Sequence, residues 1–149
     1  MGSQKNHNGE GVFSTYLYET VPGTEITMYG LKLKVIKLVV DKDGKNSNLP
    51  QCSASSDGYL CLGKDGLPKQ LRIYKDHNWS VDYDWGHPHT NYTKYGGDGR
   101  HFEKGTVHVQ EYGGGSDRNS YGARYMNNDE METIGKIIHH FNPSVKLRP

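Results

Sequence analysis

Hydrophobic and polar residues alternate along several short stretches of the chain, as in half-buried β-strands. Between Trp79 and Trp85 the odd positions are aromatic or aliphatic, and the even positions are Ser80, Asp82 and Asp84. Successive side chains of a strand point to opposite faces of its sheet. The pattern therefore predicts a strand whose polar face carries two carboxylates.

Other segments show comparable strand patterns. His108 lies on the face opposite Val107 and Val109, so it would face the carboxylates of the 79–85 segment if the two strands paired. The turn residues Asp65-Gly66 separate two short apolar runs and predict a hairpin. The further strands are predicted at 12–18, 31–40, 59–62, 70–74 and 106–112.

Near the C-terminus the period changes to that of a helix. Asn127 and Glu130 have the spacing of a capping box, and Asn142-Pro143 ends the segment. The helix is predicted over 128–141 with an apolar face formed by Met131, Ile134, Ile137, Ile138 and Phe141. Strands followed by one amphipathic helix predict an α+β fold, with a mainly antiparallel, twisted sheet and one C-terminal helix.

Length and composition set limits on this picture. The 149 residues suffice for one domain, and we expect residues 1–11 to be a disordered lead-in to a single domain at 12–149. No apolar run reaches the roughly 20 residues of a membrane span. The net charge of +1 argues against a protein that coats nucleic acid through bulk charge. Cys52 and Cys61 are either joined in a disulfide or remain two separate thiols.

The candidate chemistry lies between positions 76 and 108, which hold five of the eight histidines. Imidazole exchanges protons near neutral pH and also binds metals. The sequence Gly86-His87-Pro88-His89 follows the predicted acidic strand, so these histidines are candidates for acid–base catalysis, for metal ligation with Asp82 and Asp84, or simply for a strand-end loop. His108 beside a carboxylate is either a general acid or base or one half of a solvated cross-strand pair.

Cations and polar side chains near these segments are candidates for holding phosphate. Arginine presents paired donors to two phosphate oxygens, although each such cation is also compatible with an ordinary solvated role. Arg118 and Tyr121 stand in a polar loop that follows three glycines. The basic side chains of this region are Lys94, Arg100, Lys104, Arg118 and Arg124, and His101 follows the glycine turn at 96–99.

The segment 79–84, the His-Pro-His loop, Arg100-His101-Phe102 and Val107-His108-Val109 together resemble the C-terminal toxin domains of bacterial polymorphic toxins of the contact-dependent-inhibition and Rhs types. The resemblance covers roughly residues 76–112. It implies a metal-independent ribonuclease on an α+β scaffold, neutralised by a cognate immunity protein. It also implies delivery from a bacterial producer and action in the cytoplasm of a target cell.

Our hypothesis is therefore an endoribonuclease domain that uses neither cofactor nor metal. Its catalytic residues are chosen on local chemistry, with His87 or His89 and His108 as acid and base, and Asp82 or Asp84 orienting an imidazole. The predicted RNA-binding residues are Lys94, Arg100, His101, Arg118 and Tyr121. Two alternatives stay open: a metal-dependent nuclease or hydrolase with Asp82, Asp84, His87 and His89 as ligands, and a non-enzymatic carbohydrate-binding module.

Overall fold

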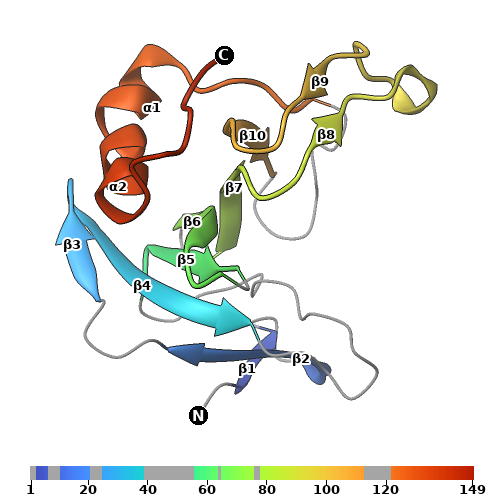
Figure 1. Cartoon of the computed structure of the whole chain (residues 1–149). Helices are drawn as coiled ribbons and strands as arrows, with labels where there is room; N and C mark the ends of the chain where they lie inside the picture. Colours follow the sequence, from blue (N-terminus) through green and yellow to red (C-terminus); the bar gives the residue numbers. More distant parts are fainter. Residues whose placement is uncertain are drawn as a thin grey trace.

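The computed structural model describes residues 3–6, 11–20, 25–38, 56–63, 65–75, 78–112 and 122–149. In this part of the chain a mixed, mostly antiparallel sheet carries C-terminal helices on one face, and a small two-stranded ribbon extends from one end (Figure 1). The predicted α+β class with a mainly antiparallel sheet is confirmed.

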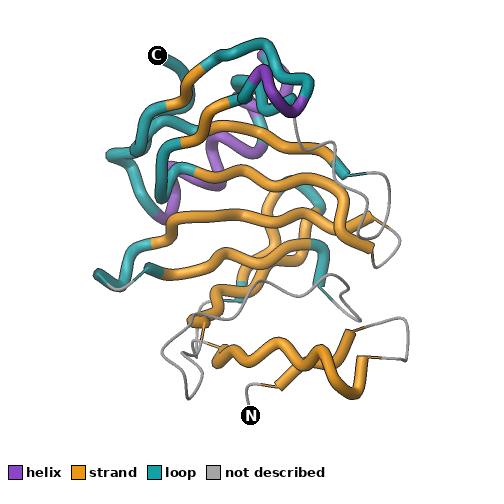
Figure 2. Tube along the Cα trace, turned by 90° about the vertical axis from the view of Figure 1, so that its right-hand side faces the viewer, coloured by secondary structure: helices purple, strands orange, loops and turns teal. Residues whose placement is uncertain are grey.

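The main sheet has the strand order β1-β2-β4-β5-β6-β7-β10, and β3 pairs with β4. Only β4 and β5 are parallel among the described pairs, and the strands lie side by side across the molecule in Figure 2. The strands of the main sheet are β1 (Ser3–Asn6), β2 (Gly11–Thr20), β3 (Ile26–Met28), β4 (Leu31–Leu38), β5 (Gly58–Leu62), β6 (Pro68–Lys75), β7 (Asn78–Asp84) and β10 (His108–Glu111). The ribbon pairs β8 (His89–Thr90) with β9 (His101–Phe102), and a 3-10 turn, η1 (Thr93–Tyr95), lies between them in the sequence.

The alternation of hydrophobic residues located six of the described strands, β2, β4, β5, β6, β7 and β10, whereas the short strands β3, β8 and β9 were not predicted. The predicted hairpin is the antiparallel pair β5–β6, and Gly66 in its turn has a φ of 81°, a backbone conformation that favours glycine. The lead-in differs from the expectation, because Ser3–Asn6 form β1 and pair with β2. A short polar segment can be a strand when a neighbouring strand supplies its hydrogen bonds, which composition alone does not reveal.

The predicted C-terminal helix is divided into α1 (Asn128–Glu132) and α2 (Ile134–Phe141). The predicted capping box is present, with reciprocal hydrogen bonds between Asn127 and Glu130. Thr133 interrupts the helix: its φ and ψ are −116° and −73°, and its hydroxyl donates to the carbonyl oxygen of Asp129 at 3.0 Å. Such a bond from a threonine side chain to the preceding turn competes with the regular helix geometry and commonly bends it.

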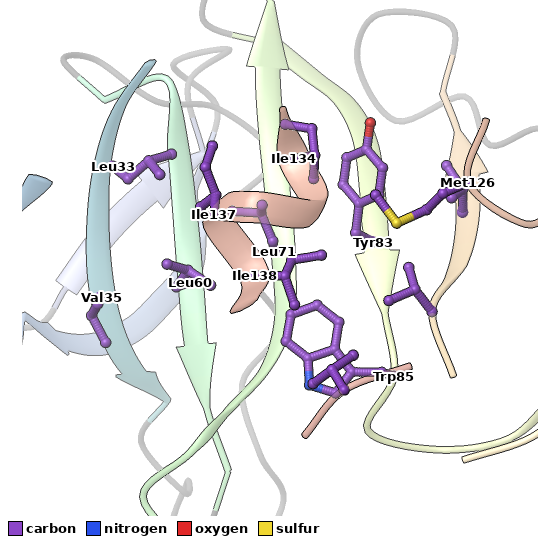
Figure 3. Close-up of a cluster of buried hydrophobic side chains, with 13 residues drawn as sticks. Leu33, Val35, Leu60, Leu71, Tyr83, Trp85, Met126, Ile134, Ile137 and Ile138 are labelled. Carbon is purple, nitrogen blue, oxygen red and sulfur yellow. The ribbon is translucent and has the colours of Figure 1, made fainter. Parts of the chain in front are cut away.

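The hydrophobic core lies between the helices and one face of the sheet. Ile137 and Ile138 of α2 are fully buried against sheet residues that include Leu71 and Trp85 (Figure 3). The Trp85 indole N–H donates to the carbonyl oxygen of Pro68 at 2.9 Å, so this large ring is buried without losing its polar bond. In the described part of the chain, no helix is long and apolar enough to cross a membrane.

The other face of β6, β7 and β10 is polar and buried. Arg72, Asp82 and Gln110 are paired across the three strands in one row. Asp84 and His108 are paired in the next row, so His108 faces the carboxylates as the alternation predicted. The sheet therefore separates an apolar core from a polar layer, and His108 is part of this polar layer.

Candidate active site

Three imidazole rings meet at one end of the polar layer. His87 and His89 come from the loop after β7 and the start of β8, and His108 comes from β10. The ring centroid of His108 is 5.1 Å from that of His89, in a stacked arrangement, and 5.8 Å from that of His87, edge to face. The side chain of His87 is 64% exposed, whereas His108 is 1% exposed. Rings from two separated stretches of sequence therefore form one group with an exposed and a buried end.

The turn after β7 brings His87 back over the strand. The backbone N–H of Gly86 donates to Asp84 Oδ1 at 3.0 Å, which closes the turn. A Cβ atom at position 86 would lie 2.8 Å from the Cβ of Lys69 on β6, so only glycine allows this close approach. The resulting conformation places the His87 ring next to the carboxylate of Asp84.

Asp84 and His87 form a carboxylate–imidazole pair. His87 Nδ1 and Asp84 Oδ1 are 3.0 Å apart, so a protonated Nδ1 donates to the carboxylate and Nε2 is the nitrogen left for a substrate. Burial raises the pKa of the Asp84 carboxyl from 3.8 to about 6, although the charge of His87 and the bond from Gly86 act in the opposite direction. Asp84 is therefore mostly ionised at neutral pH, at a cost in stability.

This cost predicts how stability depends on pH. Between pH 3.8 and about 6 the native state holds the Asp84 proton and the unfolded state does not, so the free energy of unfolding falls as pH rises through this window. Asp84→Asn removes the buried charge. We expect its unfolding free energy relative to the wild type to rise by up to about 3 kcal/mol from about pH 4 to about pH 7.5.

Urea denaturation at a series of pH values measures this difference. Asp129→Asn, which removes an exposed carboxylate at the start of α1, serves as the control and should show a much smaller change with pH. A pH-independent difference between Asp84→Asn and the wild type would contradict the buried charge.

His89 is oriented by a buried amide. Its Nε2 lies 3.1 Å from Asn91 Oδ1, and the amide nitrogen of Asn91 donates to the carbonyl oxygen of Ala123 at 2.9 Å. Because the amide orientation is fixed by Ala123, Oδ1 faces His89 and Nε2 must carry the proton. Asn91 is 1% exposed and was not singled out in the sequence, where a lone Asn between polar residues gives no signal of this role.

One of the predicted cations lies close to the histidines. The guanidinium carbon of Arg100 is 5.9 Å from the ring centroid of Phe102 and 6.0 Å from that of Tyr125. The ring of Phe102 in turn lies 6.2 Å from His89 and 5.7 Å from His108. Phe102 thus links Arg100 to the histidine group through ring contacts.

The other predicted substrate-binding residues are placed differently. Lys94 lies over the exposed rings of Tyr92 and Tyr95 in η1. His101 pairs with Thr90 in the ribbon, on the face opposite His89, and its Nδ1 lies 2.7 Å from the Thr90 hydroxyl. Arg118 and Tyr121 lie outside the described residues.

Asp82 has a different partner from Asp84. The Nε and Nη2 atoms of Arg72 donate to its two oxygens at 2.7 and 2.9 Å, in a bidentate pair that is almost completely buried. Gln70 and Tyr112 also donate to Asp82 Oδ2. Of the two carboxylates proposed to orient an imidazole, Asp84 contacts a histidine ring and Asp82 binds a guanidinium. The alternating pattern of 70–74 could have indicated that Arg72 belongs to the polar face, since it places Gln70 and Arg72 on the same face of the strand.

The alternative metal site has no ready ligand set. Among the residues that the structure describes, no three His, Cys, Asp or Glu side chains are arranged so that they could hold a metal ion. Cys61 is buried, and the question of its bond to Cys52 stays open because Cys52 is not among the described residues.

Comparisons with known proteins give no relative: no protein-family model, no curated protein and no solved structure matches this chain.

Proposed function

We propose that this chain is an endoribonuclease that cleaves RNA by acid–base catalysis without a metal ion. The observation that carries the proposal is the pair of His87 and Asp84, with an exposed imidazole on a buried carboxylate, in one ring cluster with a second oriented imidazole at His89, since both rings contact that of His108. Transesterification of RNA requires two proton-transferring groups at one site.

The reaction uses the nucleophile that RNA carries. One imidazole removes the proton of a 2′-hydroxyl, and the 2′-oxygen attacks the adjacent phosphorus. The bond from phosphorus to the 5′-oxygen breaks as a second, protonated imidazole delivers a proton to that oxygen. The products are a 2′,3′-cyclic phosphate and a free 5′-hydroxyl, so protons and charge balance without any other reactant.

His87 and His89 suit these two roles better than His108. His87 presents Nε2 at the surface, with Nδ1 bound to Asp84. His108 is 1% exposed, so we assign it to positioning: its ring stacks on His89 and contacts His87. The guanidinium of Arg100 lies over the ring of Phe102 and forms an exposed ion pair with Asp98 at 3.4 Å. It is the cation proposed to stabilise the negative charge that develops on the phosphate.

The resemblance to polymorphic toxins supports a wider proposal about the biological setting. In it, the domain is delivered by a bacterial producer, degrades RNA in the cytoplasm of the target cell and is bound by a cognate immunity protein. The histidine-based site is consistent with this setting, because an enzyme without a metal requirement acts in any cytoplasm.

A direct test uses labelled single-stranded RNA in buffer that contains EDTA. We expect cleavage with 2′,3′-cyclic phosphate ends, and no cleavage of the same sequence when every 2′-hydroxyl is replaced by a 2′-O-methyl group. Mass spectrometry of the fragments identifies the ends. His87→Ala purified in the same way is the control for contaminating ribonucleases.

Two results would contradict the proposal. Cleavage that stops in EDTA and returns with a divalent ion would support the metal-dependent alternative. Intact RNA at every protein concentration, with the protein folded, would favour a binding module.

A further inference from the structure

A hollow with basic side chains on its wall is lined in part by Tyr125, whose ring contacts Phe102. It has a volume of about 600 Å³ and lies between β9, the turn at 103–106 and the C-terminal segment. Its wall includes the side chains of His101, Glu103, Lys104, Tyr125, Ser144 and Lys146.

The two lysines of the hollow are held on ordered backbone. The N–H of Lys146 donates to the carbonyl oxygen of Gly105 at 2.9 Å, and the N–H of Val107 donates to the carbonyl oxygen of Lys146 at 2.9 Å. These bonds fix the C-terminal segment against the turn that carries Lys104. The backbone positions of Lys104 and Lys146 are therefore fixed relative to one another, and both side chains are exposed to solvent.

Their charges are also available to a ligand. Within the described part of the chain, Lys104 and Lys146 have no carboxylate within ion-pair distance, whereas Lys34, Lys69 and Lys136 each have one. Glu103 also lines the hollow and carries the opposite charge. Since two lysines oppose one glutamate among these side chains, the hollow favours an anion.

Ring contacts connect this hollow to the candidate active site. Tyr125 lines it, and the Tyr125 ring centroid is 4.7 Å from that of Phe102. Phe102 contacts His89 and His108, and Arg100 lies near both Phe102 and Tyr125. The hollow and the histidine group therefore share the packing of Tyr125 and the buried Phe102.

A second hollow continues the first. It has a volume of about 250 Å³ and shares Lys104, Gly105 and Ser144 with the larger one. It adds Trp85, Lys69 and Asp65 as lining residues, the last two forming an ion pair at 4.0 Å. Two hollows joined at a lysine accommodate an extended anion better than a small one.

We infer that the two hollows form one groove, which binds the single-stranded RNA flanking the scissile phosphate. In this groove Lys104 and Lys146 bind phosphates, and Tyr125 packs against a base. A positively charged groove combined with an aromatic side chain is the usual architecture for single strands. The inference rests on the proposed function, since it assigns the binding subsite of that same enzyme.

Fluorescence anisotropy with a labelled 2′-O-methyl RNA tests the inference, because this probe binds without being cleaved. We expect Lys104→Gln/Lys146→Gln to weaken binding at least about tenfold, and the slope of log K against log salt to lose about 1.4, or about 0.7 for each phosphate contact. Lys32→Gln/Lys136→Gln removes two exposed lysines elsewhere and should leave the affinity within about twofold.

The outcomes separate the groove from the catalysis. Binding that depends on Lys104 and Lys146 supports the groove even if the wild type cleaves no RNA, in which case only the proposed activity fails. Equal affinity of the groove variant and the wild type, or no binding by the wild type, overturns the groove. Displacement of the probe by poly-glutamate as readily as by unlabelled RNA would also overturn it, since the groove would then accept acidic peptides equally.

Discussion

Replacing His87 with alanine is expected to lower kcat/KM for RNA cleavage by about 10²- to 10⁴-fold, the usual contribution of a positioned acid or base. The variant should still fold, because the His87 side chain is 64% exposed, but the buried Asp84 carboxylate loses its imidazole partner and its pKa should rise further. The variant should also relieve the growth arrest expected when the wild type is expressed in a bacterial cytoplasm. Initial rates on a labelled oligonucleotide and thermal unfolding curves measure the two effects separately.

His140→Ala is the matched control for this variant. His140 is an exposed histidine near the end of α2, and its ring contacts Phe141 rather than the histidine group. It should retain the wild-type rate within about twofold. If both variants keep full activity, His87 transfers no proton and the site lies elsewhere. If both lose activity with their fold intact, the effect of His87 is not specific to its place beside Asp84.

The parts of the fold that alternation or helical periodicity controls could be predicted from the sequence. Val107 and Val109 are buried in the apolar core on one face of the sheet. His108, which lies between them in the sequence, therefore points to the opposite face, where it is paired with Asp84. The helix face was predictable for the same reason, since Ile134, Ile137 and Ile138 recur at helical spacing. In each case one residue's position determines the orientation of its neighbours on the same element.

Features that depend on the neighbouring strand could not be predicted. Asp82 and Asp84 are equivalent in the sequence pattern, yet Asp82 lies opposite Arg72 and Asp84 lies opposite His108. Only the register of β6, β7 and β10 distinguishes them, and register is a property of the assembled sheet. The break at Thr133 was missed for a different reason, because a threonine hydroxyl can either face solvent or bond to the preceding turn.

The same distinction predicts opposite consequences for the two carboxylates. Asp82→Ala should destabilise the protein by about 3–5 kcal/mol, because it leaves the buried guanidinium of Arg72 without its bidentate partner. Burial alone would lower the pKa of Arg72, but the adjacent Asp82 carboxylate outweighs burial and the pKa is raised. Arg72 thus stays charged, and the lost partner cannot be replaced by giving up a proton.

Urea denaturation at neutral pH measures this loss, and Glu132→Ala is the matched control. Glu132 forms an exposed ion pair with Lys136 at 3.3 Å, a type of pair that contributes at most about 1 kcal/mol. A loss for Asp82→Ala as small as that of the control would mean that the buried pair is not needed for the fold.

A double variant separates the roles of charge and shape. Asp82→Leu/Arg72→Met removes both charges, and it should recover part of the stability lost in Asp82→Ala, since an apolar pair of similar volume often replaces a buried ion pair without loss. RNA cleavage by this double variant should be retained while it remains folded, because Asp84 and not Asp82 contacts His87. A folded but inactive double variant would instead assign Asp82 to the catalytic machinery and would remove the distinction between the two carboxylates.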